Sequence, residues 1–420
     1  MNQTLKILMM AGLVFGLTAC NTATQQANPE TGGDVKSLVI AEDVEYGQED
    51  YKKIVNANNQ LGMDLIAQVP ADDYGNMFVS PLSLYMALSM LYNGAAGDTK
   101  AEIADVLHAT ISPDEMNKAN ASLSMMLAGN SDSVQLAISN SIWLNQSYDF
   151  QPEFAQNTQD YFNAKTEKID VSDPESADLI NGWVKDSTNG MIEKMVEKPL
   201  PKNLKTILLN AVYFNGKWHT PFEEKNTEEQ PFHLADGTTV DMPFMKMEQH
   251  WSYMENDQFQ AVALPYGDWE ASMYVFLPKE HSSLEEFKTA LTPDNWNNWR
   301  RSFNTGEGLV SLPKFEMEYE IQLNDALMAL GMETAFGASD LSNMYEQGSG
   351  QISHVKQKTA LKVDEKGTEA AAVTEVAIAV SSEQPEHFTL EVNRPFFVAI
   401  EDTETSTILF LGAVSNPAVE

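Results

Sequence analysis

The chain has 420 residues, of which 43% are hydrophobic and 21% are charged, an ordinary composition for a globular protein with a large core. It carries 26 Lys and Arg against 61 Asp and Glu, so its formal net charge is −35. A surface this acidic repels other polyanions, which argues against DNA, RNA and heparin-like polymers as partners.

The N-terminus has the pattern of a secretory signal. Met1 to Lys6 is a short basic region, and Ile7 to Leu17 is an apolar run of 11 residues, too short to span a bilayer. The run ends in Leu17-Thr18-Ala19-Cys20, which resembles the lipobox of bacterial lipoproteins. We therefore predict that residues 1–19 are removed and that Cys20 is lipidated; an ordinary signal peptide with a chance Cys is the alternative.

Cys20 is the only Cys in the chain, so its acylation would leave no thiol for a disulfide, a metal site or a nucleophile. Several acyl chains would hold the protein firmly to a membrane. Asn21 is not the Asp that resembles an inner-membrane retention signal. We expect the outer membrane of the cell envelope, on either its periplasmic or its exterior face.

Residues 20–48 are polar, include Gly32-Gly33, and indicate a flexible tether. No second linker and no internal repeat follows, so residues 49–420 are predicted to form one domain. Its first half has helical signals: apolar residues at helical spacing from Ile54 to Val69, an N-cap at Ser80-Pro81, a capping box from Thr99 to Glu102, and a helix start at Asp173-Pro174.

The second half is richer in apolar runs of β-branched and aromatic residues, which predict strands. These runs span residues 207–214, 271–277, 309–312, 396–400 and 408–411, with a further strand at 358–365. Helices and strands do not alternate regularly, so the fold class is α+β rather than a doubly wound sheet.

Motifs for catalysis and for cofactors or metals are missing from the sequence. It contains no G-x-G-x-x-G, Walker loop or H-E-x-x-H, and none of its seven His lies within five residues of another. Ser353 and Lys356 match an S-x-x-K pattern, but residues three apart on a strand face opposite sides. We predict neither an enzyme nor a metal or cofactor site.

Residues 367–382 have the alternating sequence pattern of a strand, with one of its two faces uncharged. Every second residue from Thr368 to Val380 is uncharged, whereas Glu369 and Glu375 belong to the alternate set. A plain edge strand or an Ala-rich helix end would be the simpler explanations. An exposed strand this apolar would be an aggregation hazard, so it needs a place to pair.

Residues 365–372 (EKGTEAAA) resemble the hinge motif of the serpin family almost letter for letter. Further segments resemble the family in the same order along the chain, from about Tyr51 to Pro417; they are residues 76–83, 209–218, 330–336, 393–396 and 409–417. The resemblance implies three β-sheets packed with helices, a metastable native state and an exposed reactive-centre loop.

In functional terms, the resemblance implies a suicide inhibitor that forms a covalent acyl-enzyme with a serine protease and then inserts its cut loop into the large sheet. It assigns the hinge to Glu365, Gly367, Thr368, Glu369, Ala370, Ala371, Ala372 and Val373. It also assigns the breach and shutter to Trp218, Asn210, Ser80, Ser83 and Gln357, with Gln357 in place of the family's usual shutter His. The scissile bond falls between Ser381 and Ser382 or, one residue earlier, between Val380 and Ser381.

The residues around this bond indicate the target. No Arg or Lys occurs between Gly367 and Asn393, so a small apolar specificity pocket fits best. We expect elastase-like or subtilisin-like serine proteases, with a papain-like cysteine protease as an alternative. Lys118 is the only base between Asp114 and Leu127, so no polyanion cofactor is expected, and we expect a monomer. The competing function is that of a non-inhibitory serpin acting as a binding or chaperone module.

Overall fold

The computed structural model describes residues 40–41, 44–128, 131, 133–188, 190–347, 351–368 and 387–418. The predicted signal peptide, the lipidation site Cys20 and the greater part of the predicted tether lie outside these ranges. Ile40 is buried, and the carbonyl of Gln48 accepts a hydrogen bond from Ser122, so residues before Glu49 also pack on the domain. Within the described ranges, no helix is both long enough and apolar enough to cross a membrane.

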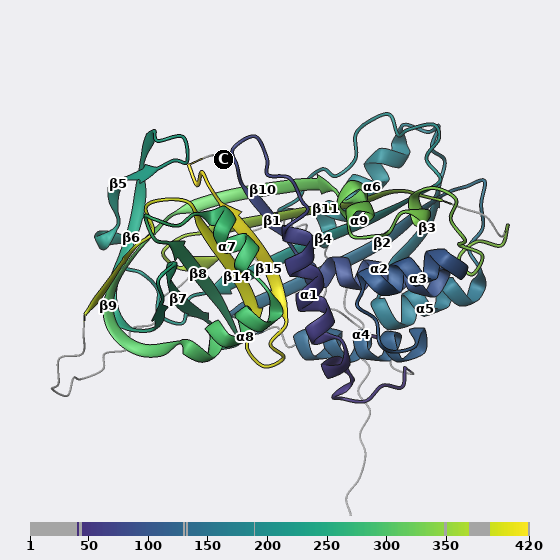
Figure 1. The fold of residues 1–420 in the computed structure, drawn as a ribbon. Coiled ribbons are helices and arrows are strands. Elements are labelled where there is room, and N and C mark those ends of the chain that lie inside the picture. Colours follow the sequence, from purple (N-terminus) through teal and green to yellow (C-terminus); the bar gives the residue numbers. More distant parts are fainter. Residues whose placement is uncertain are drawn as a thin grey trace, which may run out of the picture. The chain divides into compact units, whose positions relative to one another are not determined.

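One of the two sheets has six strands. Its strand order is β10 (Phe315–Gln322), β11 (Ile352–Val363), β4 (Thr206–Lys217), β2 (Val134–Asn145) and β3 (Lys165–Ile169), and the short β12 (Gly367–Thr368) also pairs with β4. Its longer strands cross the view in Figure 1 from β10 to β3. The central pair, β11 and β4, runs parallel although about 140 residues separate them in the chain. The pairs β10–β11, β12–β4 and β2–β4 are antiparallel, whereas β2 and β3 are parallel.

The second sheet has nine strands. They are β1 (Met77–Val79), β15 (Ile408–Val414), β14 (Phe396–Asp402), β8 (Ala271–Pro278), β7 (Phe259–Tyr266), β6 (Thr239–Glu255), β9 (Asn304–Pro313), β13 (Phe388–Glu391) and, beside β6, β5 (Glu228–His233). Two of the three expected sheets are thus joined, because the 17-residue β6 pairs with β5 at its beginning and with β7 at its end.

The helices are α1 (Val55–Ile66), α2 (Pro81–Gly94), α3 (Gly97–Val106), α4 (Pro113–Leu127), α5 (Pro152–Phe162), α6 (Glu175–Ser187), α7 (Leu284–Ala290), α8 (Pro293–Ser302) and α9 (Asn324–Ala329). Ser80 caps α2 and Pro81 occupies its first position, as predicted. The predicted capping box at Thr99 is wrong, because α3 already begins at Gly97 and Glu102 instead accepts hydrogen bonds from Thr334. Capping boxes occur at Ser112 and Ser283.

Strand β4 is buried on both faces, which explains its nearly unbroken apolar sequence. Leu208, Val212 and Phe214 belong to the large core that includes α2. The alternate residues Ile207, Leu209 and Ala211 pack in a second cluster with Ile180 and Val184 of α6. Helices α2 and α6 therefore cover opposite faces of the six-stranded sheet (Figure 1).

Candidate functional site

The gap between β4 and β11 is the central feature of the candidate site. The two strands are paired from Thr206 to Val212 on β4, opposite Ile352 to Thr359 on β11. Beyond this stretch β4 continues to Lys217 and β11 to Val363 without pairing to each other. The chain then turns between Asp364 and Gly367, and β12 pairs antiparallel with Gly216 and Lys217 of β4. A segment extended beyond Thr368 would run antiparallel to both strands, along the gap.

Gly367 is required at this turn for two reasons. Its φ is +143°, a backbone conformation that L side chains rarely adopt. A Cβ atom placed on it would lie 2.1 Å from the carbonyl oxygen of Gly216, which is backbone and cannot move aside as a side chain can. The predicted hinge Gly therefore allows β12 to lie close against β4.

Glu365 anchors the hinge from the side of β10. Its carboxylate is buried, forms a 2.8 Å ion pair with Lys314 and accepts a 2.7 Å hydrogen bond from Thr227. Burial raises the pKa of this carboxyl, but the bonds from Lys314 and Thr227 outweigh burial and leave the pKa below its ordinary value. Glu365 is therefore charged at neutral pH and fixes the start of the loop.

The breach residue Trp218 holds the other side of the turn. Its ring Nε1 donates to the carbonyl of Asp364 at 2.9 Å, and its backbone N–H donates to the carbonyl of Lys366 at 2.9 Å. The indole stacks on Tyr266 with ring centroids 4.4 Å apart. The hydroxyl of Tyr266 in turn shares a 2.8 Å hydrogen bond with that of Thr368, which is fully buried. The first inward-facing hinge residue is thus already inserted in the sheet.

The predicted shutter residues meet beneath the paired half of β4 and β11. The side-chain amide of Gln357 accepts from the backbone N–H of Ser80 at 2.9 Å and donates to the Ser80 carbonyl and to Asn210 Oδ1, each at 3.0 Å. Ser83 Oγ donates to the same Asn210 oxygen, and Asn210 Nδ2 donates to Asn140. The Gln357 side chain, at the position where the family resemblance implies a His, both donates and accepts hydrogen bonds here and does not titrate.

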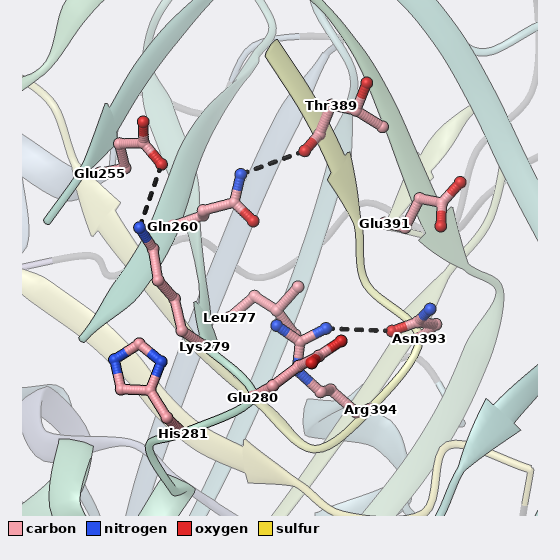
Figure 2. Close-up of a pocket in the computed structure, with 10 residues that line it drawn as sticks. All are labelled: Glu255, Gln260, Leu277, Lys279, Glu280, His281, Thr389, Glu391, Asn393 and Arg394. Atoms are coloured by element: carbon pink, nitrogen blue, oxygen red, sulfur yellow. Dashed lines mark hydrogen bonds and ion pairs between the residues drawn. The ribbon is translucent and has the colours of Figure 1, made fainter. Parts of the chain in front are cut away.

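The far end of the loop returns at β13, the edge strand beside β9. Phe388 stacks on Tyr253 with ring centroids 3.7 Å apart, and Gln260 donates to the Thr389 carbonyl at 3.1 Å. A hollow of about 480 Å³ lies beside this strand. Most of the side chains that line it are charged, of both signs, or polar (Figure 2). Contacts through Phe388 and Gln260 therefore add to the ladder that holds this edge strand.

Several predicted residues lie outside the described ranges: Glu369, Ala370, Ala371, Ala372, Val373, Val380, Ser381 and Ser382. Four contributors to the site were missed by the sequence analysis: Tyr266, Lys314, Thr227 and Asn140. They come from strands and loops distant in sequence and belong to no local motif, so only the fold reveals them.

The S-x-x-K residues do not form a catalytic pair. Ser353 Oγ accepts a hydrogen bond from the backbone of Lys205, whereas Lys356 forms an ion pair with Glu320 on β10. Both residues lie on β11, as expected for a strand. Among the described residues, no group of three or more His, Cys, Asp or Glu is arranged to hold a metal ion.

Comparison with known proteins assigns this arrangement to a family. The family model described as serpin (serine protease inhibitor) matches residues 56–417. Iripin-1 of Ixodes ricinus is 34% identical over 373 residues, covering 87% of this chain and 95% of that protein, and an uncharacterized serpin-like protein of Thermococcus kodakarensis is 33% identical over 88% of this chain and 87% of its own length.

Solved structures agree with the sequence comparison. The thermophilic serpin tengpin in its native state is 33% identical with a TM-score of 0.82, covering 90% of this chain and 97% of tengpin. Human thyroxine-binding globulin complexed with thyroxine is 25% identical with a TM-score of 0.78, covering 88% and 100%. Serpins are in general protease inhibitors and not enzymes, and this chain belongs to the serpin family.

Proposed function

We propose that this serpin traps serine endopeptidases covalently by inserting its cut loop into the six-stranded sheet. The observation that carries the proposal is the open end of the gap between β4 and β11, where Gly367 and Thr368 are already paired with β4. The protease serine attacks the scissile carbonyl, the new amino terminus leaves with a proton, and the ester remains. About 10 new backbone hydrogen bonds at roughly 1 kcal/mol each would favour insertion by on the order of 10 kcal/mol.

The proposed scissile bond is Ser381–Ser382, or Val380–Ser381 one residue earlier, and the proposed targets are elastase-like or subtilisin-like proteases. The small side chains around this bond support a small apolar specificity pocket. A hinge of small, uncharged inward-facing residues, Thr368, Ala370 and Ala372, supports insertion over simple cleavage.

The test is to mix the purified protein with pancreatic elastase, with subtilisin and with papain, and to analyse each mixture on a denaturing gel. A band at the summed masses that survives boiling in detergent is the expected result with a serine protease, and mass spectrometry of the released peptide identifies the bond. Cleavage of the loop without such a band and without a rise in melting temperature would refute inhibition and favour a binding serpin.

We also propose that the protein is a bacterial lipoprotein of the outer membrane, anchored through Cys20. The support is the signal sequence followed by Leu17-Thr18-Ala19-Cys20. Expression in a Gram-negative host should place the wild-type protein in the outer-membrane fraction and the Cys20→Ser variant elsewhere. A Cys20→Ser variant that still fractionates with the outer membrane would contradict the anchor, and protease treatment of intact cells distinguishes the two faces.

A further inference from the structure

A cavity of about 440 Å³ lies between the beginning of β2, the C-terminal end of α4 and two turns between strands. The turns are residues 267–270, which join β7 to β8, and residues 403–407, which join β14 to β15. The N–H of Thr403 donates to the Glu270 carbonyl at 2.9 Å, so the two turns are bonded to each other. The volume is within the range of small-molecule sites, about 300–1,000 Å³.

The floor of the cavity is apolar. Leu136 and Phe214, which are paired neighbours on β2 and β4, are 4% and 3% exposed. Leu127 of α4 and Leu409 of β15 line the same floor and are also buried. All four side chains belong to the large core that includes α2, so they lie on the same face of the six-stranded sheet. An apolar group in the cavity would therefore contact the hydrophobic core.

Trp269 forms an aromatic wall of this cavity at the tip of the β7–β8 turn. Its side chain is 51% exposed, one of four large hydrophobic side chains exposed among the described residues. Its φ is +67°, which is uncommon for a bulky residue. Its one ring contact within the described chain is with His219, with ring centroids 5.3 Å apart. Half of the indole is thus left in solvent, where an occupant of the cavity would cover it.

The charged groups that line the cavity are all acidic, and none of them forms an ion pair with a residue in the described ranges. They are Asp268, Glu270, Asp402 and Glu404. Burial raises the pKa of the Asp402 carboxyl, although hydrogen bonds from Thr405 lower it, and the neighbouring Glu404 raises it further. No cation of the described chain offsets this charge. Charge complementarity therefore favours a cationic occupant over a neutral or anionic one.

We propose that this cavity binds a small ammonium ion that carries an apolar group. The apolar group lies on the floor formed by Leu136 and Phe214. The ammonium lies against Trp269 and the acidic side chains, where attraction to the face of an indole and to carboxylates acts on the same charge. The site is separate from the reactive loop and from the gap between β4 and β11.

The probe for the test is benzyltrimethylammonium, which has a permanent positive charge beside a benzene ring. Titration of the purified protein in about 0.3 M NaCl, which screens the general attraction of the acidic surface for cations, is followed by calorimetry and by ligand-observed NMR. We expect saturable binding at one site with a Kd of about 1 mM. Tetramethylammonium lacks the ring and phenylacetate has the opposite charge, so each should bind at least about tenfold more weakly.

Replacement of Trp269 tests the aromatic wall. Trp269→Gly removes the indole and suits the φ of +67°, so the variant should melt no lower than the wild type but bind the probe at least about fivefold more weakly. Tyr74→Ala removes another exposed aromatic side chain, which does not line the cavity, and should bind as the wild type does. Wild-type affinity in Trp269→Gly would overturn the proposal.

Two double variants of equal net charge test the acidic side chains. Asp268→Asn with Glu404→Gln removes two charges that line the cavity and should weaken binding at least about fivefold. Glu229→Gln with Asp241→Asn removes two exposed charges from β5 and β6, away from the cavity lining, and should not weaken it. Equal weakening in the two variants, or no saturable binding of the probe, would also overturn the proposal. No protease takes part, so the outcome is independent of the proposed inhibition.

Discussion

Gly367 illustrates how one residue determines the geometry of the hinge. Its left-handed φ and its contact with the Gly216 carbonyl are separate constraints, and both follow from the close approach of β12 to β4. The resemblance of residues 365–372 to the serpin hinge motif predicts a hinge at this position. The reason that Gly is needed at this position appears only when β4 lies beside it, since Gly216 is about 150 residues away.

We predict that Gly367→Ala destabilises the uncut protein by roughly 3 kcal/mol or more, because backbone strain and a clash with backbone atoms add together. Gly190→Ala is the matched control: its φ is +83°, but a Cβ there meets nothing within 4 Å. The loss of stability on thermal unfolding of Gly190→Ala measures backbone strain alone, and the additional loss in Gly367→Ala measures the clash with Gly216. Equal losses of stability would show that contact with Gly216 contributes nothing.

Glu401 on β14 is a buried acid away from the hinge. Its carboxylate is paired with Arg300 at 2.7 Å and accepts from Trp296, and burial raises its pKa to about 7. Between the ordinary value of 4.5 and 7 the folded state binds more protons than the unfolded chain, so the free energy of unfolding falls as pH rises through this window.

We therefore expect the wild type to lose up to roughly 3 kcal/mol of stability between pH 5 and 8 through this group, and Glu401→Gln to lose less. Denaturant unfolding at several pH values measures the difference between the two proteins. Asp149→Asn, a change at an exposed ion pair, should leave the wild-type slope unchanged. Parallel curves for wild type and Glu401→Gln would contradict the role of Glu401.

At the scale of elements, local patterns predicted what each segment is but not which segments are neighbours. The apolar run at 207–214 and the strand at 358–365 were recognised and correspond to β4 and β11, although β11 begins at Ile352 and ends at Val363. Their parallel pairing joins segments that are far apart in the chain, and helices α2 and α6 pack on the two faces of the sheet that they form. The sequence likewise does not indicate that β6 joins two of the expected sheets. A 17-residue strand shared by two sheets has no hydrophobic periodicity that distinguishes it from other strands.

The shutter yields a prediction at this scale. Gln357→Leu leaves the backbone N–H and carbonyl of Ser80 and the side chain of Asn210 without one partner each, all of them buried. We expect a loss of roughly 2–4 kcal/mol in unfolding free energy. Gln357→His, which introduces the residue that the family resemblance implies here, should lose less at pH 8. A Leu variant as stable as wild type would show that this network does not hold β11 to α2.

The hinge yields another prediction from the sequence. Ala370 lies outside the described residues, but its alternation with Thr368 places it among the inward-facing set. Ala370→Pro removes a ladder donor and should convert an inhibitor into a substrate, with cleavage but no stable complex on a denaturing gel. An inserted segment would have a strand on each side, so Glu369→Pro removes a donor toward the other neighbour and should have the same effect. Stable complexes formed by Ala370→Pro would contradict loop insertion.

For the whole molecule, the net charge of −35 opposes compaction. Most ion pairs in the described structure are exposed and contribute little, whereas repulsion among the excess carboxylates acts over about 10 Å at 0.1 M salt. We expect the melting temperature to rise by several degrees between about 0.02 and 0.5 M NaCl, and equally in choline chloride. A fall in melting temperature with salt would show that attractive pairs dominate.

The buried Thr368 has a kinetic consequence. When a strand inserts into a sheet, the slow step is nucleation. The first contacts cost chain entropy before enough ladder hydrogen bonds have formed to compensate for it. Here Thr368 is bonded to Tyr266 and β12 is paired with β4 in the uncut molecule. Nucleation therefore precedes the encounter with a protease, and what remains after cleavage is propagation, one residue at a time, toward the paired stretch that begins at Val212 and Thr359.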